Sequence, residues 1–165
     1  MKIFFALFFL LAIILAAYPF LDQSETSEAL SGLPWQIEIY ADGSTQVFGL
    51  HIGSSRLSDA IDILGDDMEL AIVAAADEGG DLEMYYGHYR AGLLSGKLIL
   101  LTDIDEQEIK QWRDKAVKSE YMATGKAKKY TLSADDIPQV LDEVIIGLTF
   151  IPAVNLDEEV ILARF

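Results

Sequence analysis

The chain has 165 residues, with 12 Lys and Arg against 27 Asp and Glu, and a formal net charge of −15. This length suits one folded domain and not two. The charge excludes a general nucleic-acid-binding protein, because such a protein presents a basic surface to phosphates. The absence of cysteine excludes a disulfide scaffold, thiolate metal sites, a cysteine nucleophile and a lipid-modified N-terminal cysteine.

Residues 3–21 form an uncharged run of 19 residues, IFFALFFLLAIILAAYPFL. At about 1.5 Å per residue, a helix of this run crosses most of the roughly 30 Å core of a bilayer. A cleaved signal peptide would need small residues three and one positions before the cut, but Leu15 or Ile14 occupies the former position. We therefore predict a transmembrane anchor over residues 1–21. A cleaved signal sequence and a buried core helix are the alternatives.

The charges that flank this run predict its orientation. Lys2 precedes it, acidic residues follow it, and no Lys or Arg occurs again before Arg56. Basic flanks stay in the cytoplasm, so we expect a single-pass protein of the cytoplasmic (inner) membrane with its C-terminal domain in the periplasm or its extracytoplasmic equivalent. Residues 22–33 are small, polar and acidic, which predicts a linker, and residues 34–165 form the folded domain.

The first predicted elements of that domain are a hairpin and a helix. Alternation over residues 35–40 and 45–52, around Asp42 and Gly43, predicts two strands joined by a tight turn. The following helix has apolar residues at the spacing i, i+3, i+4 and i+7, with a serine as its cap and a glycine as its end. These residues are Ser54, Ser55, Leu57, Ala60, Ile61, Leu64 and Gly65.

Three strands of an antiparallel meander come next, over residues 68–76, 82–90 and 93–102. A helix over residues 106–118 follows, with Asp105 as its cap and Glu108 as its capping-box partner.

The last elements are two further helices and two strands. We predict a short strand over residues 128–132 and a buried strand over residues 145–151. Between them we predict a helix that is capped by Asp135 or Asp136. The C-terminal residues 156–164 form a helix capped by Asn155 or, as the alternative, a strand. The predicted fold class is α+β: an N-terminal transmembrane helix followed by one antiparallel-sheet domain packed with about three helices.

Residues 50–101 also contain a family pattern: a glycine and a hydroxyl residue precede an amphipathic helix that ends in aliphatic residues and a glycine, and tyrosines lie in the middle strand of three. The residues that carry it are Gly53, Ser54, Ile61, Leu64, Gly65, Tyr85 and Tyr86. This segment resembles the small periplasmic SmpA/OmlA (BamE-like) module. The chain differs in having no lipidated cysteine, one helix ahead of the sheet, and further residues behind it. The resemblance implies a non-catalytic module that binds protein or envelope components.

One strand concentrates residue types that are enriched at protein interfaces. The candidate partner-binding residues are Tyr85, Tyr86, His88, Tyr89 and Arg90. The alternative is ordinary packing: Met84 and Tyr86 face the core, Tyr85 and Tyr89 pack across strands, and Gly87 forms a bulge.

Residues 110–129 contain seven basic and two acidic residues and carry a net charge of +5 within an acidic chain. The candidate basic patch for anionic lipid or an acidic partner comprises Lys110, Arg113, Lys118, Lys126, Lys128 and Lys129. The alternative is a solvated helix face with ion pairs between Glu106 and Lys110 and between Asp114 and Lys118, followed by an exposed loop.

No motif predicts catalysis. The two histidines, His51 and His88, have no metal-ligand spacing, the acidic clusters do not match a calcium loop, and the nucleophile-elbow and phosphate-loop patterns are absent. We therefore predict no catalytic residue, metal or cofactor, and the sequence identifies no small-molecule ligand.

These observations predict a non-enzymatic, membrane-anchored periplasmic binding or scaffolding domain that engages an envelope protein partner. Two alternatives stay open. One is an accessory subunit of a membrane complex, held through its anchor helix. The other is an anchored hydrolase that uses scattered carboxylates, since such sites need no linear motif.

Overall fold

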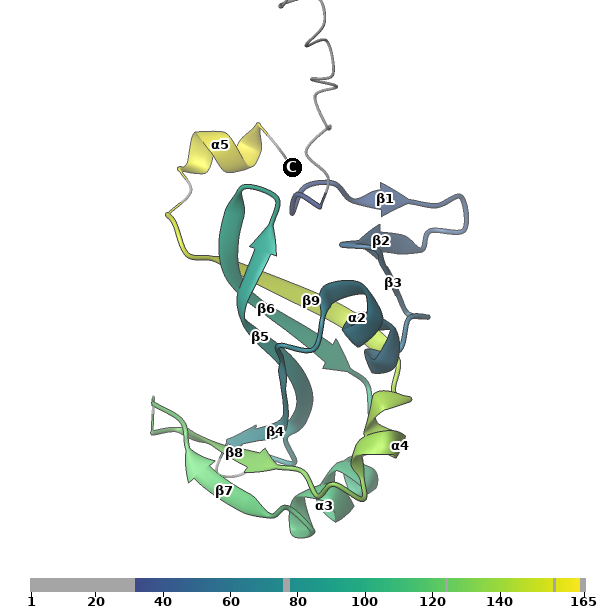
Figure 1. The fold of residues 1–165 in the computed structure, drawn as a ribbon, viewed down its shortest axis with the longest axis vertical. Coiled ribbons are helices and arrows are strands. Elements are labelled where there is room, and N and C mark those ends of the chain that lie inside the picture. The colour runs from purple at the N-terminus through teal and green to yellow at the C-terminus, as the bar shows by residue number, and fades with distance from the viewer. Residues whose placement is uncertain (1–31, 76–77, 124, 156, 164–165) are drawn as a thin grey trace, which may run out of the picture. The chain divides into compact units, whose positions relative to one another are not determined.

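Six strands form one antiparallel sheet in the computed structural model of the chain (Figure 1). The structure describes residues 32–75, 78–123, 125–155 and 157–163. In their order across the sheet, the strands are β7 (Lys118–Tyr121), β8 (Ala127–Thr131), β4 (Glu69–Ala75), β5 (Asp81–Ala91), β6 (Leu94–Thr102) and β9 (Ile145–Pro152). The sequence pattern predicts every one of these strands except β7.

A second, smaller sheet contains β1 (Glu38–Ile39), β2 (Thr45–Val47) and β3 (Leu50–Ile52). The prediction of one continuous strand over residues 45–52 is wrong, because the chain reverses at Phe48 and Gly49. Both residues have positive φ, 53° and 82°, as in the type I′ turn that suits two-residue hairpins. The domain therefore contains two sheets where one was predicted.

Helices contribute to the core from three places in the chain. The helices are α2 (Leu57–Leu64), α3 (Glu106–Asp114), α4 (Ile137–Leu141) and α5 (Glu158–Leu162). Leu57, Ile109 and Val140 place α2, α3 and α4 in the main hydrophobic core, each at most 3% exposed. The predicted α+β class, with antiparallel pairing and about three packed helices, is confirmed for the described residues.

The larger sheet has two chemically different faces. Met84 and Tyr86 of β5 pair with Leu100 and Leu98 of β6, and all four side chains are buried. This inner face forms the core. The outer face carries the intervening residues, such as Tyr85, which are more exposed and more polar.

The predicted caps of α2 and α3 have different outcomes. Asp105 caps α3 as predicted, because its Oδ1 accepts a hydrogen bond of 2.8 Å from the Gln107 amide. For α2 the serine cap is wrong, since Arg56 occupies the N-cap position. The Oγ of Ser55 instead accepts a hydrogen bond from the His51 amide at 3.0 Å.

The predicted helix over residues 106–118 is too long. It ends at Asp114, and the chain then joins the sheet as β7. The Val117 amide donates to the Thr131 carbonyl at 3.0 Å, and Lys118 pairs with Thr131. The edge of β8 offers these residues a hydrogen-bond ladder that the local helical pattern does not reveal. At the C-terminus the helix alternative is correct, but Asp157 rather than Asn155 stands at the N-cap of α5.

The predicted membrane anchor over residues 1–21 lies outside the described residues. Within the part of the chain that the structure describes, no helix has the length and apolar character needed to cross a bilayer. The anchor, its orientation and the linker remain predictions.

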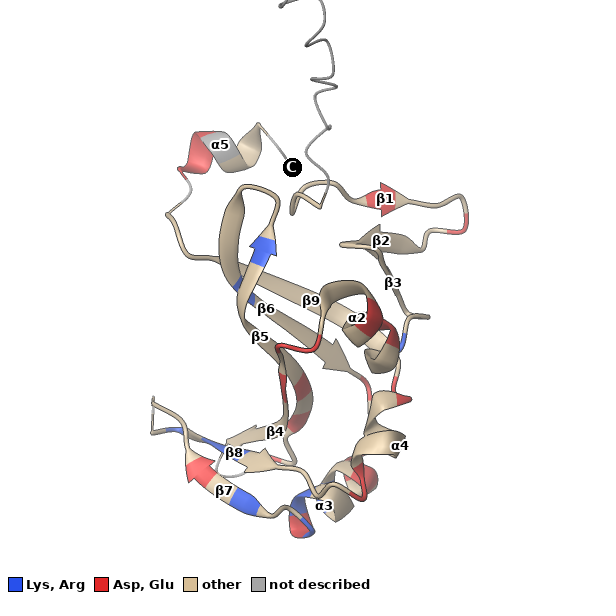
Figure 2. Ribbon diagram, viewed as in Figure 1, with Lys and Arg blue, Asp and Glu red and all other residues tan. Residues whose placement is uncertain are grey.

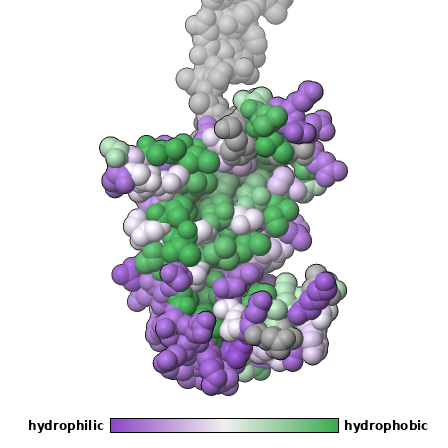
Figure 3. All heavy atoms as spheres, turned by 180° about the vertical axis from the view of Figure 1, so that it is seen from behind, coloured by the Kyte–Doolittle hydropathy of each residue, from purple (hydrophilic) through white to green (hydrophobic). Residues whose placement is uncertain are grey.

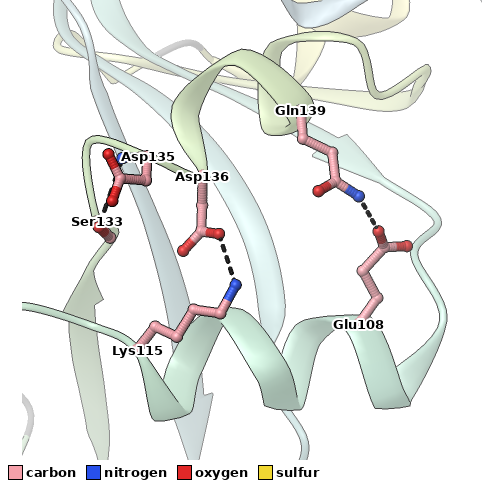
Figure 4. A network of polar contacts seen from close by, with 6 residues as sticks. All are labelled: Glu108, Lys115, Ser133, Asp135, Asp136 and Gln139. Atoms are coloured by element: carbon pink, nitrogen blue, oxygen red, sulfur yellow. Dashed lines mark hydrogen bonds and ion pairs between the residues drawn. The ribbon is translucent and has the colours of Figure 1, made fainter.

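Polar contacts join α3 to α4 (Figure 4). Lys115 Nζ lies 2.9 Å from Asp136 Oδ1, and the Asp136 side chain is only 7% exposed. The second carboxylate oxygen of Asp136 has no hydrogen-bond partner among the described residues. Glu108, which was predicted to complete a capping box, accepts a hydrogen bond from Gln139 Nε2 of α4. Asp136 stands at the N-cap of α4 but makes no cap hydrogen bond.

We expect Lys115→Met to lower the free energy of unfolding by about 1–3 kcal/mol, because it leaves the buried Asp136 carboxylate without its cation. Adding Asp136→Asn should recover part of the loss by removing that charge. The control is Lys110→Met, whose pair with Asp114 is exposed on both sides and should change stability by less than about 1 kcal/mol. Urea unfolding followed by tryptophan fluorescence measures all three. Equal losses for Lys115→Met and Lys110→Met would contradict this account.

Gly96 of β6 lies where β9 and the Phe150 ring approach most closely. A Cβ atom added at Gly96 would stand 2.4 Å from the Ile151 carbonyl oxygen and 2.8 Å from the Phe150 ring. A Cβ atom at Gly147 of β9 would meet only the Leu101 side chain, at 3.7 Å.

We therefore expect Gly96→Ala to destabilise the domain by about 1–3 kcal/mol, since the backbone of β9 has to shift. Gly147→Ala is the matched control, and it should be close to neutral because its methyl group makes an ordinary contact. Thermal unfolding of both variants checks the difference. A Gly96→Ala variant as stable as Gly147→Ala would show that β9 is not held this closely to β6.

Candidate functional site: an apolar groove beside strand β9

The predicted partner-binding tyrosines lie on β5 but do not share a face. Tyr86 is 3% exposed and its hydroxyl donates to the Gly65 carbonyl at 3.0 Å. Met84 is also buried, so both residues face the core as the packing alternative predicts. The pairing of β5 with β6 shifts between Tyr86 and Tyr89, which is the bulge expected around Gly87.

This bulge decides where the remaining candidates point. Because one extra residue enters β5, Tyr89 returns to the inner face, where its ring lies 6.3 Å from that of Tyr86. Tyr85, His88 and Arg90 therefore remain as the surface members of the predicted set. Tyr85 and His88 line a shallow hollow of about 360 Å³ together with Lys97. Their role in binding a partner stays a prediction.

The predicted basic patch is divided by neighbouring acidic residues. Lys110 pairs with Asp114 at 3.5 Å, and Lys118 pairs with Glu120 at 2.7 Å, so the predicted partners were wrong. Lys129 of β8 binds Glu69 at 2.9 Å. Hydrogen bonding from Lys118 and Lys129 lowers the pKa of the Glu120 carboxyl, and hydrogen bonding to Glu69 raises the pKa of Lys129.

The other three members of the basic patch do come together. Arg113, Lys126 and Lys128 line a hollow of about 560 Å³ with Tyr121 and Tyr130. Lys128 Nζ lies 4.7 Å from the Tyr121 ring centroid, while the Arg113 guanidinium donates to backbone carbonyls at 2.8 and 3.1 Å. Backbone carbonyls leave the guanidinium charge in place, so this hollow has three cationic side chains, Arg113, Lys126 and Lys128, beside Asp114.

Two carboxyls have the raised pKa that a hydrolytic acid would need. Burial raises the pKa of Glu83 and of Glu143. Glu83 lies on the outer face of the sheet, in a hollow with Tyr85 and Lys129, whereas Glu143 follows α4. None of the hollows described here contains both acids, so the geometry lends the hydrolase alternative no support. In the described residues there is also no group of three or more metal-ligating side chains placed to hold an ion.

The largest concave surface described here is an apolar groove of about 760 Å³ beside β9. We call it the β9 groove. One wall comes from the small sheet and the segment before it: Pro34, Trp35, Ile37, Thr45, Val47 and Ile52. The other wall comes from β9 and the segment after it: Leu148, Pro152, Val154, Asn155 and Ile161. None of these side chains is charged.

The floor of the β9 groove is aromatic. Phe48 and Phe150 line it, and their ring centroids lie 6.0 Å apart in an edge-to-face arrangement. Tyr89 lies below, 5.2 Å from Phe48 and 6.4 Å from Phe150. These rings join the small sheet, β5 and β9 beneath an exposed aliphatic rim, where Ile37, Val154 and Ile161 are 41%, 52% and 43% exposed.

Charge is distributed unevenly around the domain. Acidic residues stand on β1, on the loop after it and at the start of α5, whereas basic residues gather around β7, β8 and α3 (Figure 2). On the face seen in Figure 3, apolar surface covers the upper and middle parts, and the part below is hydrophilic. The groove lining is thus uncharged, with acidic residues on β1 and α5 and basic residues on β5 and β6 in the surrounding elements.

Sequence reasoning missed this groove. Its walls come from segments that are far apart in the chain, and each segment contributes residues that fit an ordinary strand or loop. The one sequence feature that could have indicated the groove is the uncharged strand IIGLTFIP of β9. Its apolar run instead favoured the prediction of a buried strand.

No family model, curated protein or solved structure matches the chain. The helix α2 and the strands β4, β5 and β6 that the residue pattern predicts are present, and they do not test the resemblance to the SmpA/OmlA module. Membership of that family remains a prediction.

The buried tyrosine of the candidate set predicts how stability depends on pH. Burial, with smaller contributions from Tyr89 and Asp66, raises the pKa of the Tyr86 phenol to about 12. In an unfolded chain the pKa of a tyrosine side chain is about 10. The unfolded state therefore loses its proton first, and the free energy of unfolding should fall between pH 10 and pH 12 by up to about 1.4 kcal/mol per pH unit.

Urea unfolding at a series of pH values measures this dependence. Tyr86→Phe should remove part of the slope, and Tyr121→Phe, at a side chain that is 70% exposed, serves as the control. A slope that survives Tyr86→Phe unchanged would place the alkaline sensitivity elsewhere.

Proposed function

We propose that the protein is a non-enzymatic, membrane-anchored binding domain of the cell envelope. In this proposal residues 1–21 hold it in the cytoplasmic membrane, residues 34–165 lie outside the cytoplasm, and the β9 groove engages an apolar part of an envelope protein partner. The uncharged first segment and the acidic residues after it support the location.

The β9 groove is the observation that carries this proposal. Exposed apolar side chains that gather around a concave surface often mark a binding site. Here the lining is uncharged, the volume is about 760 Å³, and the rim residues are about half exposed. An aromatic floor with exposed aliphatic side chains above it is the composition that protein interfaces favour at their centres.

Two further surfaces fit a scaffolding role. Tyr85 and His88 line a hollow on the outer face that also contains acidic residues and suits a polar partner, whereas Lys126 and Lys128 line the basic hollow, which suits an anionic one. The resemblance of residues 50–101 to the SmpA/OmlA module also favours a binding function over catalysis.

The proposal predicts that a partner contacts the rim of the β9 groove. A photo-crosslinking amino acid at Ile37 or Val154, in the full chain expressed in the membranes of its host, should capture one defined envelope protein. The same crosslinker at Ile63 or Val117, which are 49% and 69% exposed but lie outside the groove lining, should not capture it.

A matched pair of substitutions tests the energetics with the captured partner after both proteins are purified. Val154→Asp should weaken binding by about tenfold or more, because it places a charge in an apolar interface, whereas Val117→Asp should have little effect. Both sites are exposed, so both variants should fold, which circular dichroism checks. Equal binding by the two variants, or capture of the same protein from all four positions, would refute the groove as the binding surface.

A further inference from the structure

The outer edge of β9 has unpaired backbone groups. β9 pairs with β6 on one side and with no other strand among those described. Pro152 lies opposite Gly96, and the Ala153 amide donates to the Ser95 carbonyl at 2.8 Å. Backbone groups alternate in direction along an antiparallel strand, so the N–H and C=O groups of Leu148 and Phe150 point away from β6.

This free edge is limited at both ends. At its start, Ile145 donates to the Ser55 carbonyl and accepts from the Gly53 amide, both at 2.8 Å. At its end, Pro152 has no N–H to offer, as is common for proline on an edge strand. The open edge therefore spans the four residues from Leu148 to Ile151, with the Pro152 carbonyl as a last acceptor.

The free edge borders the β9 groove, since Leu148 and Phe150 also line it. A hydrocarbon chain in the groove would cover these backbone groups without satisfying them, which is unfavourable for each buried donor or acceptor. An extended peptide would form hydrogen bonds with them and place alternate side chains in the groove. Natural edge strands are usually protected by charged residues, but β9 has none, so its edge is open to such pairing.

The charges around the groove define the partner further. Asp157, Glu158 and Glu159 lie in the chain between the lining residues Asn155 and Ile161, whereas Glu38 is paired with Gln46 on the face of the small sheet that does not line the groove. The basic residues of β5 and β6, Arg90 and Lys97, occupy outer-face positions of the larger sheet. An uncharged groove with acidic residues beside its α5 end complements an apolar segment that has Lys or Arg beside it.

From this geometry we infer that the β9 groove binds an extended apolar segment of a protein partner, flanked by basic residues, which adds a strand to the Leu148–Ile151 edge of β9. The inference rests on the proposed binding function and specifies the chemistry and the conformation of the partner.

The test uses the full chain in a lipid nanodisc and a short synthetic peptide of alternating Val and Thr with Lys at both ends. Its control is the same peptide with N-methyl groups on the backbone amides of both edges, which keeps the side chains but prevents strand pairing. We measure peptide affinity by fluorescence anisotropy, amide hydrogen exchange at Leu148 and Phe150 by NMR, and the association state by sedimentation.

We expect the unmethylated peptide to bind about tenfold or more tightly than the methylated one and to slow exchange at both amides, with Val154→Asp weakening and Val117→Asp preserving the binding. Replacing the terminal Lys residues by Glu should also weaken it. Equal affinity of the two peptides would overturn strand addition while leaving an apolar binding groove intact.

Sedimentation as a dimer that the peptide does not dissociate would assign the edge to a second copy and overturn the inference. Absence of peptide binding, with a partner still crosslinked at Ile37 and Val154, would refute the inference alone. Absence of both results would refute the proposed function as well.

Discussion

Phe48 has a backbone conformation that phenylalanine rarely adopts, and the junction of the two sheets depends on it. Its φ of 53° costs about 1–3 kcal/mol relative to an ordinary conformation. Burial of the Phe48 ring stabilises the folded state by about 1.5–3 kcal/mol. Its edge-to-face contacts with Tyr89 and Phe150 stabilise the folded state further, by about 0.5–1.5 kcal/mol each. The packing energy exceeds the strain, so the chain reverses after β2 rather than continuing as one strand.

This reversal creates the β9 groove. The aromatic contacts of Phe48 fasten the small sheet to β5 and β9, and the hydrogen bonds of Ile145 with Gly53 and Ser55 hold β3 to the start of β9. Between these attachments and the C-terminal segment, the small sheet does not pair with β9. Its apolar side chains and those of β9 then face a common space that neither sheet fills, and the edge of β9 stays unpaired.

The sequence pattern was sufficient to locate most strands of the larger sheet, but it predicted β9 as a buried strand, and most of its residues are half-buried or exposed because one edge has no neighbouring strand among those described. It was insufficient where a contact distant in the chain decides the local structure. β7 forms because β8 offers an edge to residues after Val117, and the strand break at Phe48 depends on Tyr89 and Phe150. The bulge after Tyr86 was anticipated from Gly87, but its consequence was not: it separates Tyr85 from Tyr89 and divides the candidate site between two faces.

The segments that interrupt regular alternation are therefore the ones that build the candidate site. A continuous strand over residues 45–52 would pair with its neighbours along its full length, and a regular β5 would direct Tyr89 to solvent rather than under the groove floor. Charge reinforces the same division, because the basic residues of the chain lie mainly on α3, β7 and β8, and the lining of the groove is uncharged. The net negative charge of the chain disfavours the approach of anionic phospholipid headgroups. An apolar peptide segment with basic neighbours is attracted by the same charge and fits the apolar groove, so a peptide is the favoured ligand.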